Sequence, residues 1–229
     1  MPTYKDVLSE LETLADPGAI KNKSARFGIS PEQSLGIYQA DLNRIAKRIG
    51  YDNELAEQLF DSGIYDAKLL CSKLYDPALV TEAKMDTWVR QFDTWEICDS
   101  FCSRVFARSR HAIPKALEWS ARDPEFEKRA GFATMAHYVF ADKQAEDAVF
   151  EQFFPSIVNG ASDDRKYVKK AVSWALRQIG KRNSKLNKMA IDLAIEIGEQ
   201  SNRSAQWVAN DVLRELQNGK ANILGYPRS

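Results

Sequence analysis

The sequence Phe92-Asp93-Thr94-Trp95-Glu96-Ile97-Cys98-Asp99 stands near the middle of the chain and predicts the beginning of a helix. Asp93 is expected as the N-cap, with Glu96 reaching back to it as in a capping box. Trp95 and Asp99 then lie one turn apart on the same helix, and Asp99 falls just past the edge of the apolar arc. A carboxylate beside a tryptophan at that border is either a satisfied structural acid or a functional one.

Outward from this segment, apolar residues recur at intervals of three and four, and no convincing alternation with period two appears, which predicts an all-α chain. Glycine and proline punctuate the breaks, as at Asp76-Pro77 and Asp123-Pro124. The predicted helices span 3–15, 18–25, 39–49, 52–62, 64–74, 81–91, 94–107, 111–121, 124–140, 144–158, 164–181, 184–200 and 204–218.

The loops between these helices are short, so consecutive helices are expected to pack as antiparallel pairs. The pairs 94–121, 124–158 and 164–200 recur at a spacing of roughly 35–45 residues. That spacing predicts a HEAT-like α-solenoid with a concave groove, which offers a long binding surface. A compact, irregular helical bundle is the alternative.

Composition predicts a soluble globular protein, because 44% of the 229 residues are hydrophobic and 28% are charged. No linker divides the sequence, so we expect one repeat domain over 1–229, with the tail 219–229 either loose or docked through Ile223, Leu224 and Tyr226. The amphipathic, acidic N-terminus is unlike a signal or transit peptide, and no apolar run is long enough to span a bilayer. A cytoplasmic location is therefore predicted.

Cys71, Cys98 and Cys102 are the only cysteines and are not spaced as a disulfide framework, so free buried thiols are expected. His111 and His137 are the only histidines, and no cluster has the ligand spacing of a zinc site. Neither a metal nor another cofactor is predicted. A Ser-His or Cys-His catalytic pair stays open, although no nucleophile motif supports one.

The stretch 165–188 carries only basic charges and no Asp or Glu. A run of one sign costs self-repulsion, so it indicates an anionic partner, with a plain solvated helix face as the alternative. The formal net charge of +0 argues mildly against a nucleic-acid binder. The basic residues are Arg165, Lys166, Lys169, Lys170, Arg177, Lys181, Arg182, Lys185 and Lys188.

Trp174 falls to one side of the inward face of this helix, beside Lys170, Arg177 and Lys181. A tryptophan among cations is placed to stack on or pack against a ligand that carries phosphates. The alternative is a tryptophan buried against the next helix pair. Three other tryptophans lie on apolar stripes and are predicted to be core: Trp88, Trp119 and Trp207.

Arg129 falls within the apolar stripe of its helix, among Phe126, Ala133 and Phe140. Because arginine does not lose its charge, it must meet a carboxylate, a phosphate or water there. Asp99 is the candidate partner within the chain. A purely structural ion pair between the two remains open.

The segments Trp95-x-x-x-Asp99, Lys128-Arg129-Ala130 and Val168-Lys169-Lys170-Ala171-Val172-Ser173-Trp174-Ala175-Leu176-Arg177 resemble the AlkD-type DNA alkylation repair family, and the likeness of Phe92 to Asp99 is close. Ala25-Arg26-Phe27-Gly28-Ile29 resembles the N-terminal turn of that family, and Trp207 to Leu216 resembles its last helix. The resemblance thus runs nearly end to end. Each motif is weak alone, but their order and spacing are fairly specific.

This resemblance implies a HEAT-like α-solenoid that holds duplex DNA with alkylated bases in its concave groove, and it implies no membrane or obligate protein partner. Family members include DNA glycosylases for N3- and N7-alkylated purines, which act without flipping the base into a pocket. Trp95, Trp174 and Asp99 would contact the sugar of the lesion nucleotide, with Arg129 close to a phosphate. The DNA-binding residues would be Lys166, Lys169, Lys170, Arg177, Lys181, Arg182 and Lys185.

The implied chemistry suits these residue types. An alkylated purine is a cationic leaving group, and the carboxylate of Asp99 would stabilise the oxocarbenium character of the sugar as the N-glycosidic bond breaks. A DNA-binding family member without catalysis is the second hypothesis, and a helical-repeat scaffold for a protein partner is the third.

Overall fold

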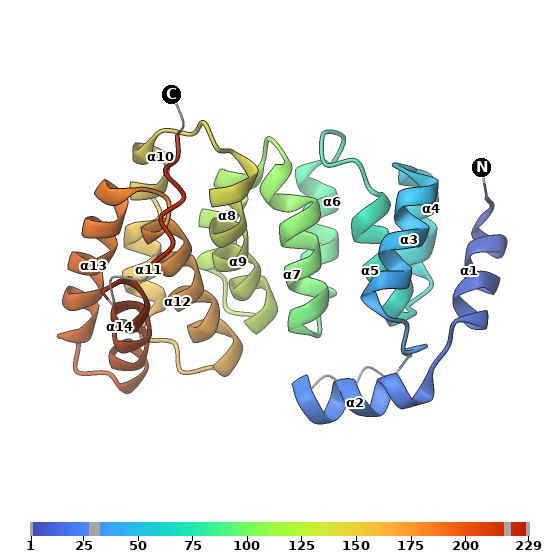
Figure 1. Ribbon diagram of the computed structural model, residues 1–229, viewed down its shortest axis with the longest axis horizontal. Helices are drawn as coiled ribbons and strands as arrows, with labels where there is room; N and C mark the ends of the chain where they lie inside the picture. The colour runs from blue at the N-terminus through green and yellow to red at the C-terminus, as the bar shows by residue number, and fades with distance from the viewer. Residues whose placement is uncertain (1, 28–32, 218–220, 228–229) are drawn as a thin grey trace. The chain divides into compact units, whose positions relative to one another are not determined.

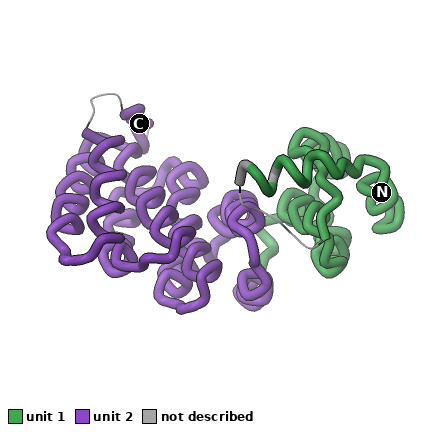
Figure 2. The backbone as a smooth tube through the Cα atoms, turned by 90° about the horizontal axis from the view of Figure 1, so that it is seen from below, with its two compact units in different colours: residues 1–80 green, residues 81–229 purple. Residues whose placement is uncertain are grey.

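The computed structural model describes residues 2–27, 33–217 and 221–227. The chain divides into two compact units, Met1–Val80 and Thr81–Ser229, which are coloured separately in Figure 2. All regular elements within the described ranges are helices, as predicted. None of these helices is long and apolar enough to cross a membrane. A single domain over 1–229 stays a prediction, and the turn proposed at 25–29 runs into the undescribed residues.

The first unit contains α1 (Tyr4–Thr13), α2 (Pro17–Phe27), α3 (Gln39–Ile49), α4 (Asn53–Asp61) and α5 (Tyr65–Leu74). Helix α5 lies at its centre and packs against α1, α3 and α4. Its fully buried Asp66 accepts hydrogen bonds from the backbone N–H groups of Leu35 (2.6 Å) and Ile37 (3.0 Å). A carboxylate buried in this way costs little because its charge is hydrogen-bonded, and it fixes the segment that leads into α3.

The second unit contains the remaining helices, which follow the predicted ranges closely (Figure 1). Two predicted bounds were wrong. The helix expected over 94–107 ends at Arg104, and a short 3-10 helix follows it. The helix expected over 144–158 is divided into two, and Pro155 lies in the first turn of the second, α11. The elements are α6 (Glu82–Val89), α7 (Trp95–Arg104), η1 (Phe106–Arg108), α8 (Ala112–Ser120), α9 (Glu125–Ala141), α10 (Asp147–Glu151), α11 (Phe154–Gly160), α12 (Lys166–Gly180), α13 (Ser184–Gly198) and α14 (Arg203–Leu216).

Helices α7, α9, α12 and α14 form a row in which each packs against the next (Figure 1). The thiols of Cys98 and Cys102 donate to the carbonyls of Phe126 (3.7 Å) and Ala130 (3.5 Å), so α7 and α9 run parallel. We call these four helices the parallel row. The cysteines are free and buried, as predicted.

Gly131 lets α9 lie directly against the backbone of α8. A Cβ atom at Gly131 would stand 2.5 Å from the backbone nitrogen of Ser120 and 2.8 Å from the carbonyl oxygen of Ala116. No side chain fits in that space, so the contact fixes α9, and with it the neighbouring Arg129, relative to α8.

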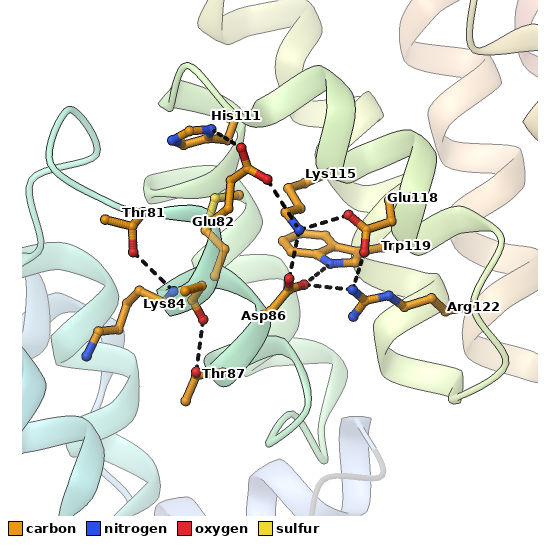
Figure 3. Close-up of polar contacts among 12 residues, drawn as sticks. Thr81, Glu82, Lys84, Asp86, Thr87, His111, Lys115, Glu118, Trp119 and Arg122 are labelled. Carbon is orange, nitrogen blue, oxygen red and sulfur yellow. Dashed lines mark hydrogen bonds and ion pairs between the residues drawn. The ribbon is translucent and has the colours of Figure 1, made fainter.

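A polar network joins α6 to α8 within the second unit (Figure 3). The carboxylate of Asp86 accepts hydrogen bonds from Lys115 Nζ (2.7 Å), Trp119 Nε1 (2.8 Å) and Arg122 Nη2 (2.8 Å). Trp119 and Trp88 are buried, as predicted, whereas Trp207 is 37% exposed and the prediction that it lies in the core was wrong.

Candidate functional site

Helix α7 begins at Trp95, and its N-cap is Thr94 rather than the predicted Asp93. The Thr94 hydroxyl accepts a hydrogen bond from the backbone N–H of Ile97 (3.4 Å). A helix that starts one residue later than expected places the threonine, instead of the aspartate, where it can satisfy the free amides of the first turn. Trp95 and Asp99 still lie one turn apart on this helix, and both are partly buried.

Asp99 and Arg129 form a bidentate ion pair between α7 and α9, which confirms the predicted partner. Arg129 Nε donates to Asp99 Oδ1 (2.9 Å), and Nη2 donates to Oδ2 (2.7 Å). The remaining nitrogen, Nη1, donates to the backbone carbonyl of Tyr167 on α12 (2.7 Å). One guanidinium therefore links three helices of the parallel row, and its planar fork fixes the orientation of the carboxylate.

The pair is asymmetric in its contact with solvent. The side chain of Asp99 is 20% exposed, whereas that of Arg129 is 8% exposed. Burial raises the pKa of Asp99 above its ordinary value, while the charge and hydrogen bonds of Arg129 act in the opposite direction. Burial also raises the pKa of the neighbouring Cys98 well above its ordinary value, so this cysteine is a neutral thiol and a poor nucleophile.

Trp174 lies on α12, two turns beyond Tyr167 or about 10 Å along the helix axis. It is partly buried, packs against the hydrophobic core and meets His137 of α9 edge to face, with ring centroids 4.8 Å apart and an interplanar angle of 85°. This contact also shows that α9 and α12 run parallel, because Arg129 and His137 follow the same order as Tyr167 and Trp174.

His137 is a residue that the sequence reasoning did not single out. Its Nε2 atom is buried and has no hydrogen-bond partner among the described residues. Burial lowers the pKa of His137 to about 4, and the charges of Arg108 and Arg129 add to the effect, so the ring beside Trp174 is neutral at pH 7. The spacing of Arg129, Ala133 and His137 at i, i+4 and i+8 is the signal that could have placed it on the face of Arg129.

The four predicted catalytic residues thus lie on three neighbouring helices. Asp99 and Arg129 are in direct contact, and Trp95 precedes Asp99 by one turn. Trp174 is connected to them through α12, whose Tyr167 carbonyl is held by Arg129.

Arg182, predicted to bind DNA, is fully buried and is a structural residue instead. Its guanidinium donates to the backbone carbonyls of Val139 (3.0 Å), Lys143 (3.1 Å) and Ala145 (2.6 Å) and lies 4.2 Å from the ring centre of Phe150. The prediction was wrong because an arginine just past the end of a helix can turn inward when backbone carbonyls accept hydrogen bonds from its two Nη groups, although its Nε has no partner among the described residues.

The C-terminal tail covers the turn that carries Arg182. The backbone N–H of Leu224 donates to the carbonyl of Lys181 (2.8 Å), and that of Tyr226 donates to the carbonyl of Arg182 (2.9 Å). Of the two alternatives for 219–229, the docked one therefore holds for residues 221–227.

Three further cations of the 165–188 stretch are paired with acids from other elements. Glu215 of α14 pairs with both Arg177 and Lys181, and Arg177 also lies 3.4 Å from Asp211. Lys185 pairs with Glu151 (2.8 Å). The stretch has one sign in the sequence but is largely neutralised in space, so the expected one-sign patch was wrong for these residues.

Lys166, Lys169 and Lys170 of α12, like Lys188 of α13, have no described carboxylate within ion-pairing distance. Lys166 and Lys170 are exposed, and Lys169 is partly exposed. The ammonium of Lys166 lies 5.4 Å from the ring centre of Tyr167, and that of Lys169 lies 5.5 Å from the ring centre of Trp207. Positive charge is therefore concentrated at the N-terminal half of α12.

Comparison with known proteins gives both a family and a fold. A family model described as "DNA alkylation repair enzyme" matches residues 7–217. A solved structure described as "A new family of proteins related to the HEAT-like repeat DNA glycosylases with affinity for branched DNA structures" is 22% identical over 97% of each chain, with a TM-score of 0.78. This likeness confirms the predicted HEAT-like α-helical repeat fold.

Two other solved structures are only weakly similar. An engineered protein is 15% identical over 92% of this chain and 98% of its own, with a TM-score of 0.38. A designed armadillo repeat protein is 12% identical over 78% of this chain and 92% of its own, with a TM-score of 0.35. No match to a curated protein was found. Because the family model covers nearly the whole sequence, the chain belongs to the DNA alkylation repair enzyme family.

Proposed function

We propose that this chain is a DNA glycosylase that hydrolyses the N-glycosidic bond of N3- or N7-alkylated purines in duplex DNA. The carboxylate of Asp99 is the observation that carries the proposal. It is oriented by both prongs of the Arg129 guanidinium, retains 20% of its side-chain exposure and stands one turn from Trp95. The exposed part of the Asp99 side chain leaves its carboxylate accessible to a substrate, whereas Arg129 behind it is nearly covered.

The reaction needs one well-placed negative charge. Alkylation makes the purine cationic, so the base leaves with the electron pair of the bond to the sugar and becomes neutral. The deoxyribose then gains oxocarbenium character, which a nearby carboxylate stabilises by about 4 kcal/mol if the charges lie ~4 Å apart in a medium of effective dielectric constant ~20. Water adds to the anomeric carbon, and its proton passes to Asp99 or to solvent.

Arg129 has a positioning role in this scheme. Each oxygen of Asp99 accepts one hydrogen bond from Arg129, so the second lone pair of each oxygen remains for water or for the sugar. A guanidinium that also holds the Tyr167 carbonyl has little freedom to follow the reacting groups, so the carboxylate is preorganised before substrate binds.

Trp95 and Trp174 would face the sugar and add cation–π stabilisation of about 0.5–2 kcal/mol each. A neutral His137 beside Trp174 suits a cationic substrate, because a charged imidazole at that place would repel it. The unpaired Lys166, Lys169 and Lys170 would contact backbone phosphates.

DNA binding without base excision is the second candidate. It is favoured by the similarity to the structure described as having affinity for branched DNA. It is also favoured by the pairing of Asp99 with Arg129, which offsets part of the charge that catalysis requires.

A single incubation distinguishes base excision from DNA binding without excision. Excess protein is incubated with a duplex that carries 7-methylguanine, and both bound DNA and free base are measured, with the unmodified duplex as control. Release of 7-methylguanine from the modified duplex supports a glycosylase. Salt-sensitive binding of both duplexes without release supports the second candidate, and absence of binding to either contradicts both.

A further inference from the structure

Trp207 of α14 is an exposed aromatic residue in a basic setting. Its side chain is 37% exposed, and the ammonium of Lys169 on α12 lies 5.5 Å from the ring centre. Arg203, one turn before Trp207, is exposed on the same face of α14. The exposed part of the ring lies between cations, an arrangement that suits a ligand with a flat aromatic face and a negative charge.

The charge around Trp207 is not compensated as it is elsewhere on α12. Lys166 and Lys170 are spaced at i and i+4 and Lys166 and Lys169 at i and i+3, so the three like charges repel one another along the helix. The first turn of α14 holds no acidic residue, so the positive end of its helix dipole favours an anion. The N-terminus of α12 is already met by Glu125, whose carboxylate accepts a hydrogen bond from the backbone N–H of Tyr167 (3.4 Å).

We propose that Trp207, together with Lys169, Lys170 and Arg203, is a stacking site for an unpaired base of a DNA strand. Nucleic-acid surfaces that bind single strands combine aromatic side chains with cations, because each base offers a flat face and each nucleotide a phosphate. The bases inside a duplex are covered on both faces, so an indole at the surface can stack only where a base is unpaired, as in a fork, flap or junction.

This site lies apart from the candidate active site although the same helix serves both. Trp174 turns towards His137 of α9, whereas Lys169 turns towards Trp207 of α14. The exposed Lys170 stands on the surface of α12 between these two directions. A strand that departs from a duplex at α12 can therefore pass over Lys170 to reach Trp207. The inference deepens the DNA-binding part of the proposed function and rests on it.

The test compares two unmodified DNA ligands, a blunt duplex and a forked duplex of the same paired sequence with single-stranded arms. Their dissociation constants are measured at one salt concentration for the unaltered protein, Trp207→Ala and Trp207→Phe. We expect Trp207→Ala to weaken binding of the fork about tenfold, the scale of one lost base–aromatic stack, and to leave blunt-duplex binding within about twofold. Trp207→Phe keeps an aromatic face and should stay close to the unaltered protein.

Phe140→Ala is the matched control, since Phe140 is 43% exposed on α9 of the same unit. It should not change the preference for the fork. The stacking site is overturned if Trp207→Ala weakens binding of the fork and the blunt duplex equally, or weakens neither. It is also overturned if Phe140→Ala weakens binding of the fork as much as Trp207→Ala does. None of these results contradicts the proposed binding of duplex DNA. Failure of the unaltered protein to bind the blunt duplex would instead contradict the proposed function itself.

Discussion

Replacing Asp99 with asparagine removes one charge and keeps the shape of the side chain, so it separates the two possible roles of this residue. Arg129 keeps its charge with its side chain only 8% exposed, and breaking a buried ion pair in this way costs about 3–5 kcal/mol. We expect the low end, about 3 kcal/mol, because Asp99 is 20% exposed and asparagine can still accept one hydrogen bond. Excision should fall by about 10²–10³, as when one electrostatic group is removed from a transition state.

The assay pairs two measurements on each protein. Denaturant unfolding gives the loss of stability, and single-turnover release of 7-methylguanine, at a temperature where the protein is fully folded, gives the rate. Asp86→Asn is the matched control. The Asp86 side chain is 17% exposed and bridges Lys115, Trp119 and Arg122, so its loss should destabilise to a similar degree without touching the reaction (Figure 3).

If Asp99→Asn excises 7-methylguanine at the rate of the unaltered protein, the Asp99 carboxylate is structural and not catalytic. If Asp86→Asn loses excision to the same extent as Asp99→Asn, the loss follows the drop in stability and not the charge of Asp99.

Three further changes test the surrounding assignments. Arg182→Met should lower the free energy of unfolding by about 2–4 kcal/mol, since it leaves buried carbonyls unpaired, yet leave the dissociation constant for duplex DNA unchanged; weakened DNA binding with full stability would contradict its burial. Glu215→Gln should tighten duplex binding and steepen its salt dependence by about 1–2 in slope, because Lys181 loses its carboxylate partner and Arg177 keeps only Asp211; unchanged binding would show that neither cation reaches a phosphate. The pKa of His137 is lowered to about 4 in the folded protein, so the unfolded chain binds this proton first as the pH falls from 6.5 to 4, and up to about 3 kcal/mol of stability should be lost over that range. The free energy of unfolding, measured at pH 6.5 and at pH 4, should fall less in His137→Gln than in the unaltered protein. An equal fall in both proteins would contradict a lowered pKa of His137.

The sequence was sufficient for features that depend on neighbours along the chain. Periodicity placed the helices within a few residues because each apolar stripe repeats locally, and an arginine inside such a stripe required a partner, which Asp99 supplies. The N-cap was misplaced by one residue, since Asp93 and Thr94 are both good caps and only the fold decides which amide lies within reach.

Features that depend on distant elements could not be predicted in this way. Glu215, which neutralises Arg177 and Lys181, follows them by more than thirty positions and reaches them only because α12 and α14 are parallel neighbours. Lys169 and Trp207 are also more than thirty positions apart in the sequence. Trp207 lies on an apolar stripe of its helix, which predicts a core residue, but its side chain is partly exposed to solvent. A charge run in a helical repeat therefore has to be judged against the next helix of the row.

The Asp99 carboxylate is proposed to serve base excision in duplex DNA. The most direct measurement is the count of abasic sites formed at a single 7-methylguanine, under enzyme excess, beside the same duplex with guanine at that position. We expect abasic sites to accumulate at the methylated position faster than by spontaneous loss, and none above background at guanine. Stoichiometric binding of the methylated duplex with abasic sites at the spontaneous rate would contradict this role.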